Sequence, residues 1–287
     1  GPFLTPVHEN VPDKDKPWKD NSFFCFWDPA QQVRGVMHVS TSPNGEGRRA
    51  RLSVLAGNTS VEVVEPLDSG TWTSASITFD GGAGFTVDTP DLKADLVSTP
   101  QYSQATFSGD TAPVAFGLDK DVPLTHFGRP MRITGTVTVE GREIAIDGEG
   151  FRDRTWGYRD ESSSLQEYYG FMFVFEGFGL HAFRLVGQDG SDMTFGYRLD
   201  DDKATPVTGL TIVRDASGLM AEAQVTLKDG TQFGIRSDGI QGGFWCPMGW
   251  TRPGPCLSAY DEFHELQTSD GLHGFGLVEQ GVLKQVP

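Results

Sequence analysis

The fold class follows from one stretch near the middle of the chain. It reads Arg132-Ile-Thr-Gly-Thr-Val-Thr-Val-Glu140, then Gly141-Arg142, then Glu143-Ile-Ala-Ile-Asp147. Polar and apolar residues alternate on both sides of the glycine turn, and successive side chains of a strand point to opposite faces. The stretch therefore predicts a β-hairpin with one face toward a core and the other toward water.

The same rhythm recurs along the chain, while helical periodicity is almost absent. The predicted strands are 23–27, 33–40, 49–55, 74–79, 85–87, 169–175, 179–186, 193–198, 209–214, 220–227 and 232–237. Many short antiparallel strands together with 36 glycines favour barrels or sandwiches, because closure removes exposed sheet edges. We expect an all-β protein. A Pro- and Asp-rich stretch at 112–130 separates two runs of strands and predicts two domains, 1–128 and 129–287.

The composition and charge of the chain limit the kinds of partner that it is expected to bind. The chain has 287 residues, of which 37% are hydrophobic, enough for substantial cores. Its formal net charge of −16 repels phosphate backbones, so nucleic acid is not an expected partner. No apolar run reaches the roughly 20 residues of a membrane-spanning helix, and the first residues lack a signal-peptide pattern. The sequence leaves the assembly open, with a homodimer as one alternative to a monomer.

The cysteines and histidines suggest neither a disulfide framework nor a metal site. The three cysteines, Cys25, Cys246 and Cys256, are widely separated and odd in number, which fits a reducing compartment such as the cytoplasm. No HxH or HExxH spacing occurs. We therefore expect a protein without metal or other cofactor.

One segment is unusually dense in charge: Gly148-Glu-Gly-Phe-Arg-Asp-Arg-Thr-Trp-Gly-Tyr-Arg-Asp160. Charges beside apolar residues are costly unless they are paired or bind a ligand. Arg152 and Asp153 suit an ion-pair cluster that fixes geometry, although Asp153 also remains a catalytic candidate. Arg154 and Trp156 are two residues apart, so in an extended chain both point to one side, where a cation and an indole could flank a substrate.

This segment also carries a resemblance to a known family. The run from Gly135 to Gly157, with His126-Phe-Gly128 upstream and 23–38 near the start, resembles the AttH/carotenoid hydratase-like superfamily. The resemblance covers most of the chain, and only the central motif is specific. It implies two tandem lipocalin-like antiparallel β-barrel or sandwich domains with a ligand site where they meet. The superfamily includes hydratases of isoprenoid double bonds and Diels–Alderase-type cyclases.

The chain departs from the hydratases of this family at two places. Where their motif carries His-x-Trp, this sequence has Arg154 and Trp156, and where they carry Tyr-x-Asp it reads His181-Ala-Phe183. The hydratase proton donor is therefore missing or displaced. Hydration of a carotenoid in particular is not expected.

Further candidate residues come from the strands and one loop. His38, His181 and Glu176 are candidate acid–base groups, with a core histidine and a solvated turn carboxylate as the plainer interpretations. The strand at 168–176 is apolar on both faces, which indicates a core on one side and either another domain or a ligand on the other. The Gly- and Pro-rich segment 244–250 is predicted as a loop that forms either a lid or cavity rim or a packing contact between the domains. The candidate substrate-binding residues are Tyr168, Met172, Phe173, Trp245, Trp250 and Arg159.

Two functions are consistent with these residues. The first is a cofactor-independent lyase or isomerase, of hydratase, dehydratase or cyclase type, acting on a hydrophobic small molecule such as a terpenoid, steroid or polyketide in an inter-domain cavity. The second is a non-catalytic carrier of an apolar ligand. A buried titratable group at the site favours the enzyme.

Overall fold

The computed structural model has an all-β fold, as the sequence predicts. It describes residues 2–4, 6, 8, 11, 13–41, 48–68, 70–79, 81, 83–108, 124–247 and 253–286. In this part of the chain, no helix is long and apolar enough to cross a membrane.

The chain forms two compact units, each with its own sheet. The first contains residues up to Gln101 and, among the later described ones, 106–108 and 124–159; the second contains 102–105 and the residues from Asp160 onward. The sequence predicts a boundary at 128/129. The units differ from this because the central hairpin and the Arg/Asp segment continue the first sheet instead of opening the second.

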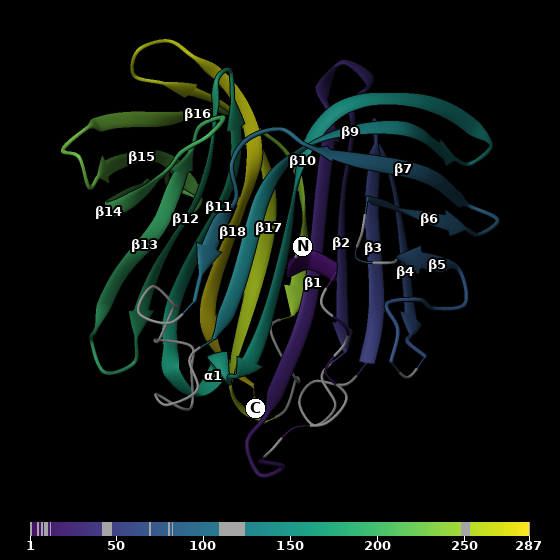
Figure 1. The fold of residues 1–287 in the computed structure, drawn as a ribbon, viewed down its shortest axis with the longest axis horizontal. Coiled ribbons are helices and arrows are strands. Elements are labelled where there is room, and N and C mark those ends of the chain that lie inside the picture. The colour runs from purple at the N-terminus through teal and green to yellow at the C-terminus, as the bar shows by residue number, and fades with distance from the viewer. Residues whose placement is uncertain are drawn as a thin grey trace. The chain divides into compact units, whose positions relative to one another are not determined.

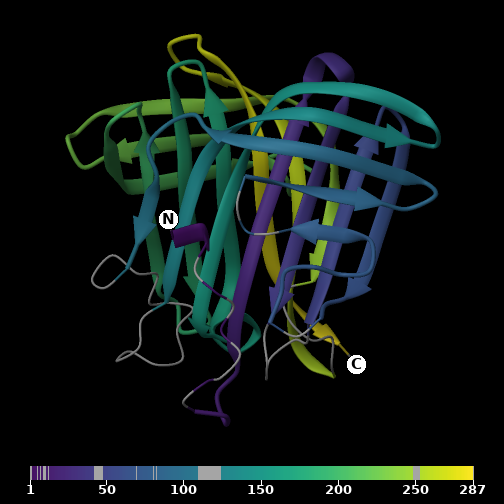
Figure 2. The ribbon, with the colours of Figure 1, turned by 45° about the vertical axis from the view of Figure 1, so that its right-hand side comes forward.

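The first unit is an open, curled antiparallel sheet with the order β4-β3-β2-β1-β10-β9-β7-β6-β5, and β8 pairs with β9 outside this order. Figure 1 labels the strands of this order, and Figure 2 shows β9 and β10, in teal, bending along their length. The bounds are β1 Trp18–Asp28, β2 Val33–Thr41, β3 Arg48–Ala56, β4 Thr59–Pro66, β5 Ile77–Phe79, β6 Gly84–Asp88, β7 Leu92–Pro100, β8 Ala105–Phe107, β9 Thr125–Val139 and β10 Arg142–Tyr158. Two short 3-10 helices are Pro2–Leu4 and Pro29–Gln31.

The second unit is a closed antiparallel barrel of the strands β11 to β18 in sequence order. Closure is made by β18, which pairs with both β17 and β11. A four-residue helix, α1 (Glu161–Ser164), precedes it. The bounds are β11 Leu165–Phe175, β12 Phe178–Gly187, β13 Asp192–Leu199, β14 Ala204–Arg214, β15 Met220–Leu227, β16 Gln232–Pro247, β17 Gly254–Thr268 and β18 His273–Val286.

Each unit has a core on one face of its sheet. In the first, Phe24 and Phe26 of β1 pack with Met37 of β2 and with residues of β9 and β10. In the second, Tyr169, Phe171, Phe173 and Phe175 pack inside the barrel, so the predicted alternation along β11 is confirmed. Tyr168, Met172 and Val174 have the opposite orientation and are buried as well.

The predicted hairpin is confirmed as β9 and β10. Two interpretations of the sequence were wrong. The first strand begins at Trp18, five residues before its predicted start, because polar residues at 19–22 lie within the sheet. Residues 244–247 belong to β16, where backbone pairing with β17 overrides the Gly- and Pro-rich composition.

Candidate functional site

The candidate site forms where the charged segment of β10 lies against β1. In this antiparallel pair Asp20 is opposite Trp156, and Ser22 is opposite Arg154. Paired residues share a face, so Asp20, Arg154 and Trp156 all project on the face that carries the core of the first unit. The sequence-based expectation that Arg154 and Trp156 share one side is confirmed.

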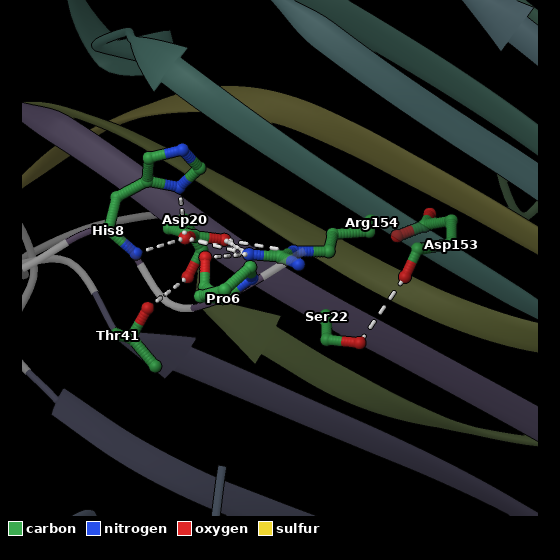
Figure 3. Close-up of polar contacts among 7 residues, drawn as sticks. All are labelled: Pro6, His8, Asp20, Ser22, Thr41, Asp153 and Arg154. Atoms are coloured by element: carbon green, nitrogen blue, oxygen red, sulfur yellow. Dashed lines mark hydrogen bonds and ion pairs between the residues drawn. The ribbon is translucent and has the colours of Figure 1, made fainter. Parts of the chain in front are cut away.

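Arg154 and Asp20 form an ion pair with both side chains fully buried. The guanidinium Nη2 donates to Oδ1 at 3.1 Å and to Oδ2 at 3.0 Å, and Nε donates to Oδ1 at 3.3 Å. Nη2 also donates to the carbonyl oxygen of Pro6 at 3.2 Å (Figure 3). Because several hydrogen bonds fix the guanidinium plane, this pair is held in one geometry.

His8 completes the cluster from the N-terminal segment. Its Nδ1 lies 2.7 Å from Asp20 Oδ2, and its backbone N–H donates to the same oxygen at 3.0 Å (Figure 3). Burial by itself raises the pKa of Asp20, but the hydrogen bonds from His8 and the charge of Arg154 outweigh burial, so the pKa of Asp20 lies below its usual value. Asp20 is therefore an anion at neutral pH.

Aromatic rings surround the side chains of Arg154 and His8. The Arg154 guanidinium lies 4.8 Å from the ring centroid of Trp72 and 5.0 Å from that of Trp156. The His8 ring lies 5.2 Å from Trp156 and 5.5 Å from Trp18. Indole faces attract cations, so Trp72 and Trp156 add favourable contacts to the Arg154 guanidinium.

The other charged residues of the segment have different surroundings. Arg152 donates to the carbonyl oxygen of Gly81 and lies over the Phe3 ring. Asp153 points to the opposite face of β10, and its carbonyl oxygen accepts from Ser22 Oγ at 3.5 Å. The carboxylate that pairs with Arg154 thus comes from β1, since neighbouring residues of a strand cannot face one another.

His38 and Arg159 are also placed in the first unit. His38 is across β1 from Asp153, with Phe23 between them in register, and so lies on the face away from Arg154. Arg159 is half-buried, and its backbone N–H donates to Pro17 O at 3.0 Å. The first unit therefore brings together Arg154 and Trp156 but separates them from Asp153 and His38.

The remaining sequence-predicted residues belong to the second unit. Tyr168, Met172 and His181 are buried and point away from the barrel core, whereas Phe173 is part of that core. Burial lowers the pKa of His181 to about 4, although the hydrogen bond of its Nδ1 with Phe171 O, at 3.0 Å, acts in the opposite direction. His181 is therefore neutral at pH 7.

The last three candidates are Glu176, Trp245 and Trp250. Glu176 is exposed in the turn between β11 and β12, which agrees with the interpretation as a solvated turn carboxylate. Trp245 is 55% exposed on β16. Trp250 lies outside the described residues.

Sequence reasoning missed Asp20 and His8. Asp20 lies in Trp18-Lys-Asp-Asn-Ser22, whose polar residues look like a loop that precedes the aromatic strand. The signal that could have found it was an alternation that continues back from Phe24 through Ser22 to Asp20. No local pattern marks His8, since its contacts are with Asp20 on β1 and with Trp156 on β10.

The arrangement can hold and transfer a proton. Asp20 accepts the hydrogen of His8 Nδ1, which leaves Nε2 as the ring nitrogen that can exchange a proton with a ligand. Among the described residues, no hydrogen bond to Nε2 is present. A carboxylate-oriented imidazole of this kind serves as a general base when neutral and as a general acid when protonated.

These features define an all-β protein with an open sheet, a closed barrel and a buried Arg154–Asp20 ion pair that His8 contacts. The family model described as Domain of unknown function (DUF7064) matches residues 7–282, and the chain belongs to this family. A search of curated proteins finds no match.

Solved structures with a similar fold extend over nearly the whole chain. Kievitone hydratase from Nectria haematococca is 16% identical, with 96% of this chain and 93% of that chain covered and a TM-score of 0.61. A Nitrosomonas europaea protein provisionally named AttH is 13% identical, with 96% and 98% covered and a TM-score of 0.65. CghA, solved with Sch210972, is 12% identical, with 92% and 88% covered and a TM-score of 0.61. The resemblance to the AttH-like superfamily is thus confirmed at the level of the fold.

Proposed function

We propose that the protein is a cofactor-independent lyase or isomerase, of hydratase, dehydratase or cyclase type, that acts on a hydrophobic small molecule. The observation that carries this proposal is the Asp20-oriented imidazole of His8 beside Trp156. Terpenoids, steroids and polyketides are the substrate classes that such an apolar, hydrogen-bonding site suits.

In a dehydration, His8 would act through its Nε2 atom. Nε2 takes a proton from carbon, the electron pair of the C–H bond forms the double bond, and the adjacent C–O bond breaks. The departing oxygen takes the proton from Nε2 and leaves as water. Hydration is the reverse sequence, and no redox partner is needed.

Asp20 and Arg154 would support this cycle by position and charge. The anionic Asp20 stabilises the imidazolium that forms, and Arg154 keeps Asp20 ionised and fixed. Arg154 is in this view a positioning residue. Trp156, which is half-buried, offers its indole to the substrate and to developing positive charge.

The similar structures support the proposal by their names. Kievitone hydratase is named for the addition of water to a small organic molecule, and CghA was solved with one, Sch210972. Both have this fold at low sequence identity, so the substrate and the reaction of this chain remain proposals. The absence of a cofactor requirement and the cytoplasmic location also stay predictions.

The test is turnover of a panel of apolar alcohols and alkenes in ¹⁸O-labelled water and in D₂O, followed by mass spectrometry. We expect one class to gain or lose water, or to isomerise. Replacing His8 by Gln should lower the rate by about 10²–10⁴-fold, the usual range for a general acid–base group. The matched control is His273→Gln, which changes an exposed histidine of the second unit.

Unchanged turnover in a folded His8→Gln variant would refute the assignment of the catalytic site.

The second candidate function is a non-catalytic carrier. The closed eight-stranded barrel favours it, since barrels of this size can hold one small ligand. Stoichiometric binding of a panel compound without any isotope exchange or mass change would identify a carrier instead of an enzyme.

A further inference from the structure

Strand β17 carries a row of polar side chains toward the barrel interior. Glu262 is opposite Val278, a residue of the barrel core, so the alternate residues Tyr260, Glu262 and His264 all share the inner face. On β18, Gln280 is opposite Tyr260 on this same face. Charged residues are rare in such a position unless they are paired.

Ser237, His264 and Glu262 form a hydrogen-bonded chain. Ser237 Oγ lies 2.7 Å from His264 Nδ1, and His264 Nε2 lies 2.8 Å from Glu262 Oε2. Both ring nitrogens of His264 are thus engaged, one by the serine hydroxyl and the other by the carboxylate. The Glu262 and His264 side chains are fully buried.

Two acceptor atoms of this face have no hydrogen-bond partner among the described residues. They are Glu262 Oε1 and Gln280 Oε1, both buried. Gln280 uses its Nε2 to donate to Gly218 O at 2.7 Å, which fixes the orientation of the amide. A buried carboxylate oxygen without a donor costs free energy, so the site is incomplete without a group that donates hydrogen bonds.

Aromatic rings lie at the half-exposed end of the row. Tyr260 is half-buried, and the ring of Trp245 lies 5.1 Å from it. Burial and the negative charge of Glu262 both raise the pKa of Tyr260, so the phenol stays neutral. A carboxylate next to aromatic faces is the combination that recognises ammonium groups.

We propose that the barrel of the second unit binds a small apolar molecule through its ammonium group, which donates to Glu262 Oε1 and Gln280 Oε1. The aromatic rings of Tyr260 and Trp245 contact the adjacent apolar part. This site uses none of the residues His8, Asp20 and Arg154, and it goes beyond the proposed function.

The test is isothermal titration calorimetry with three compounds of similar shape: 2-phenylethylammonium, 2-phenylethanol and 3-phenylpropanoate. We expect one ammonium ion to bind per chain, the alcohol to bind at least tenfold more weakly, and the carboxylate not to bind. Glu262→Gln should weaken ammonium binding at least tenfold. Glu265→Gln, an exposed position of the same strand, should leave binding unchanged.

Circular dichroism and thermal unfolding check that the Glu262→Gln variant is folded. If it is not, Gln280→Leu provides the test, because it removes the second acceptor at a half-buried position. Equal binding to wild type and to the folded variant, equal binding of the three compounds, or no binding of the ammonium ion would overturn the proposal. His8→Gln should bind the ammonium ion normally, which separates this site from the proposed catalytic one.

Discussion

Arg154 and Asp20 depend on each other for their burial. Both side chains are fully buried, and removing one partner of such a pair typically costs about 3–5 kcal/mol of stability because the other charge is left uncompensated. Substituting Arg154 therefore mixes loss of function with loss of stability. The His8 side chain is 30% exposed and tests the function more cleanly.

The buried His181 predicts a dependence of stability on pH. Its pKa is about 4 in the folded chain and 6.5 as a reference value, so between these pH values the unfolded chain binds a proton that the folded chain does not. The contribution of the neutral His181 to the free energy of unfolding is complete above pH 6.5, and about 3 kcal/mol of it is lost as the pH drops to 4. Urea unfolding at several pH values measures this. His181→Gln should remove this part of the dependence, whereas the exposed His273→Gln should not; identical pH profiles for wild type and His181→Gln would contradict the assignment.

At the scale of elements, β10 positions the candidate site through its close approach to β1. A Cβ atom on Gly148 would lie 2.1 Å from Trp27 O, and one on Gly150 would lie 2.1 Å from Cys25 O. These contacts are with backbone, so they cannot be relieved by turning a side chain. The glycines let the two strands pair over their whole length, which brings Asp20 to Arg154.

Gly150→Ala should therefore destabilise the chain. We expect a loss of about 2 kcal/mol or more in the free energy of unfolding, in line with other overpacked sites. The control is Gly239→Ala, where the nearest atom, Gln241 Nε2, is 3.6 Å from the added Cβ. It should change stability by less than about 0.5 kcal/mol. Equal midpoints of urea unfolding for the two variants would show that the strands can separate without cost.

In the whole molecule, the two units differ in how their sheets avoid pairing with another chain at an exposed edge strand. The first leaves β4 and β5 as edges, and the outer strand β4 carries Glu62 and Glu65, charged residues that discourage pairing with another chain. The second has no edge, because β18 joins β17 to β11.

Closure predicts that a fragment of residues 160–287 folds alone. Its ¹H–¹⁵N spectrum should be dispersed and its circular dichroism typical of β-structure. A fragment of residues 160–272 lacks β18 and cannot close, so it should be unfolded or aggregated. A disordered spectrum for the longer fragment would contradict the independence of the barrel.

Alternation of polar and apolar residues is a local property with a period of two, so it predicts the all-β class, the central hairpin and the faces of β11. The same period predicts that Arg154 and Trp156 share a side. The identity of the carboxylate that pairs with Arg154 emerges only from the folded chain, because the register of β1 with β10 brings Asp20 to Arg154 and the N-terminal segment brings His8 to Asp20. The same holds for Glu262 and His264, whose inward orientation follows from barrel closure. Pairing between distant segments depends on the global packing of the chain, which local patterns do not encode.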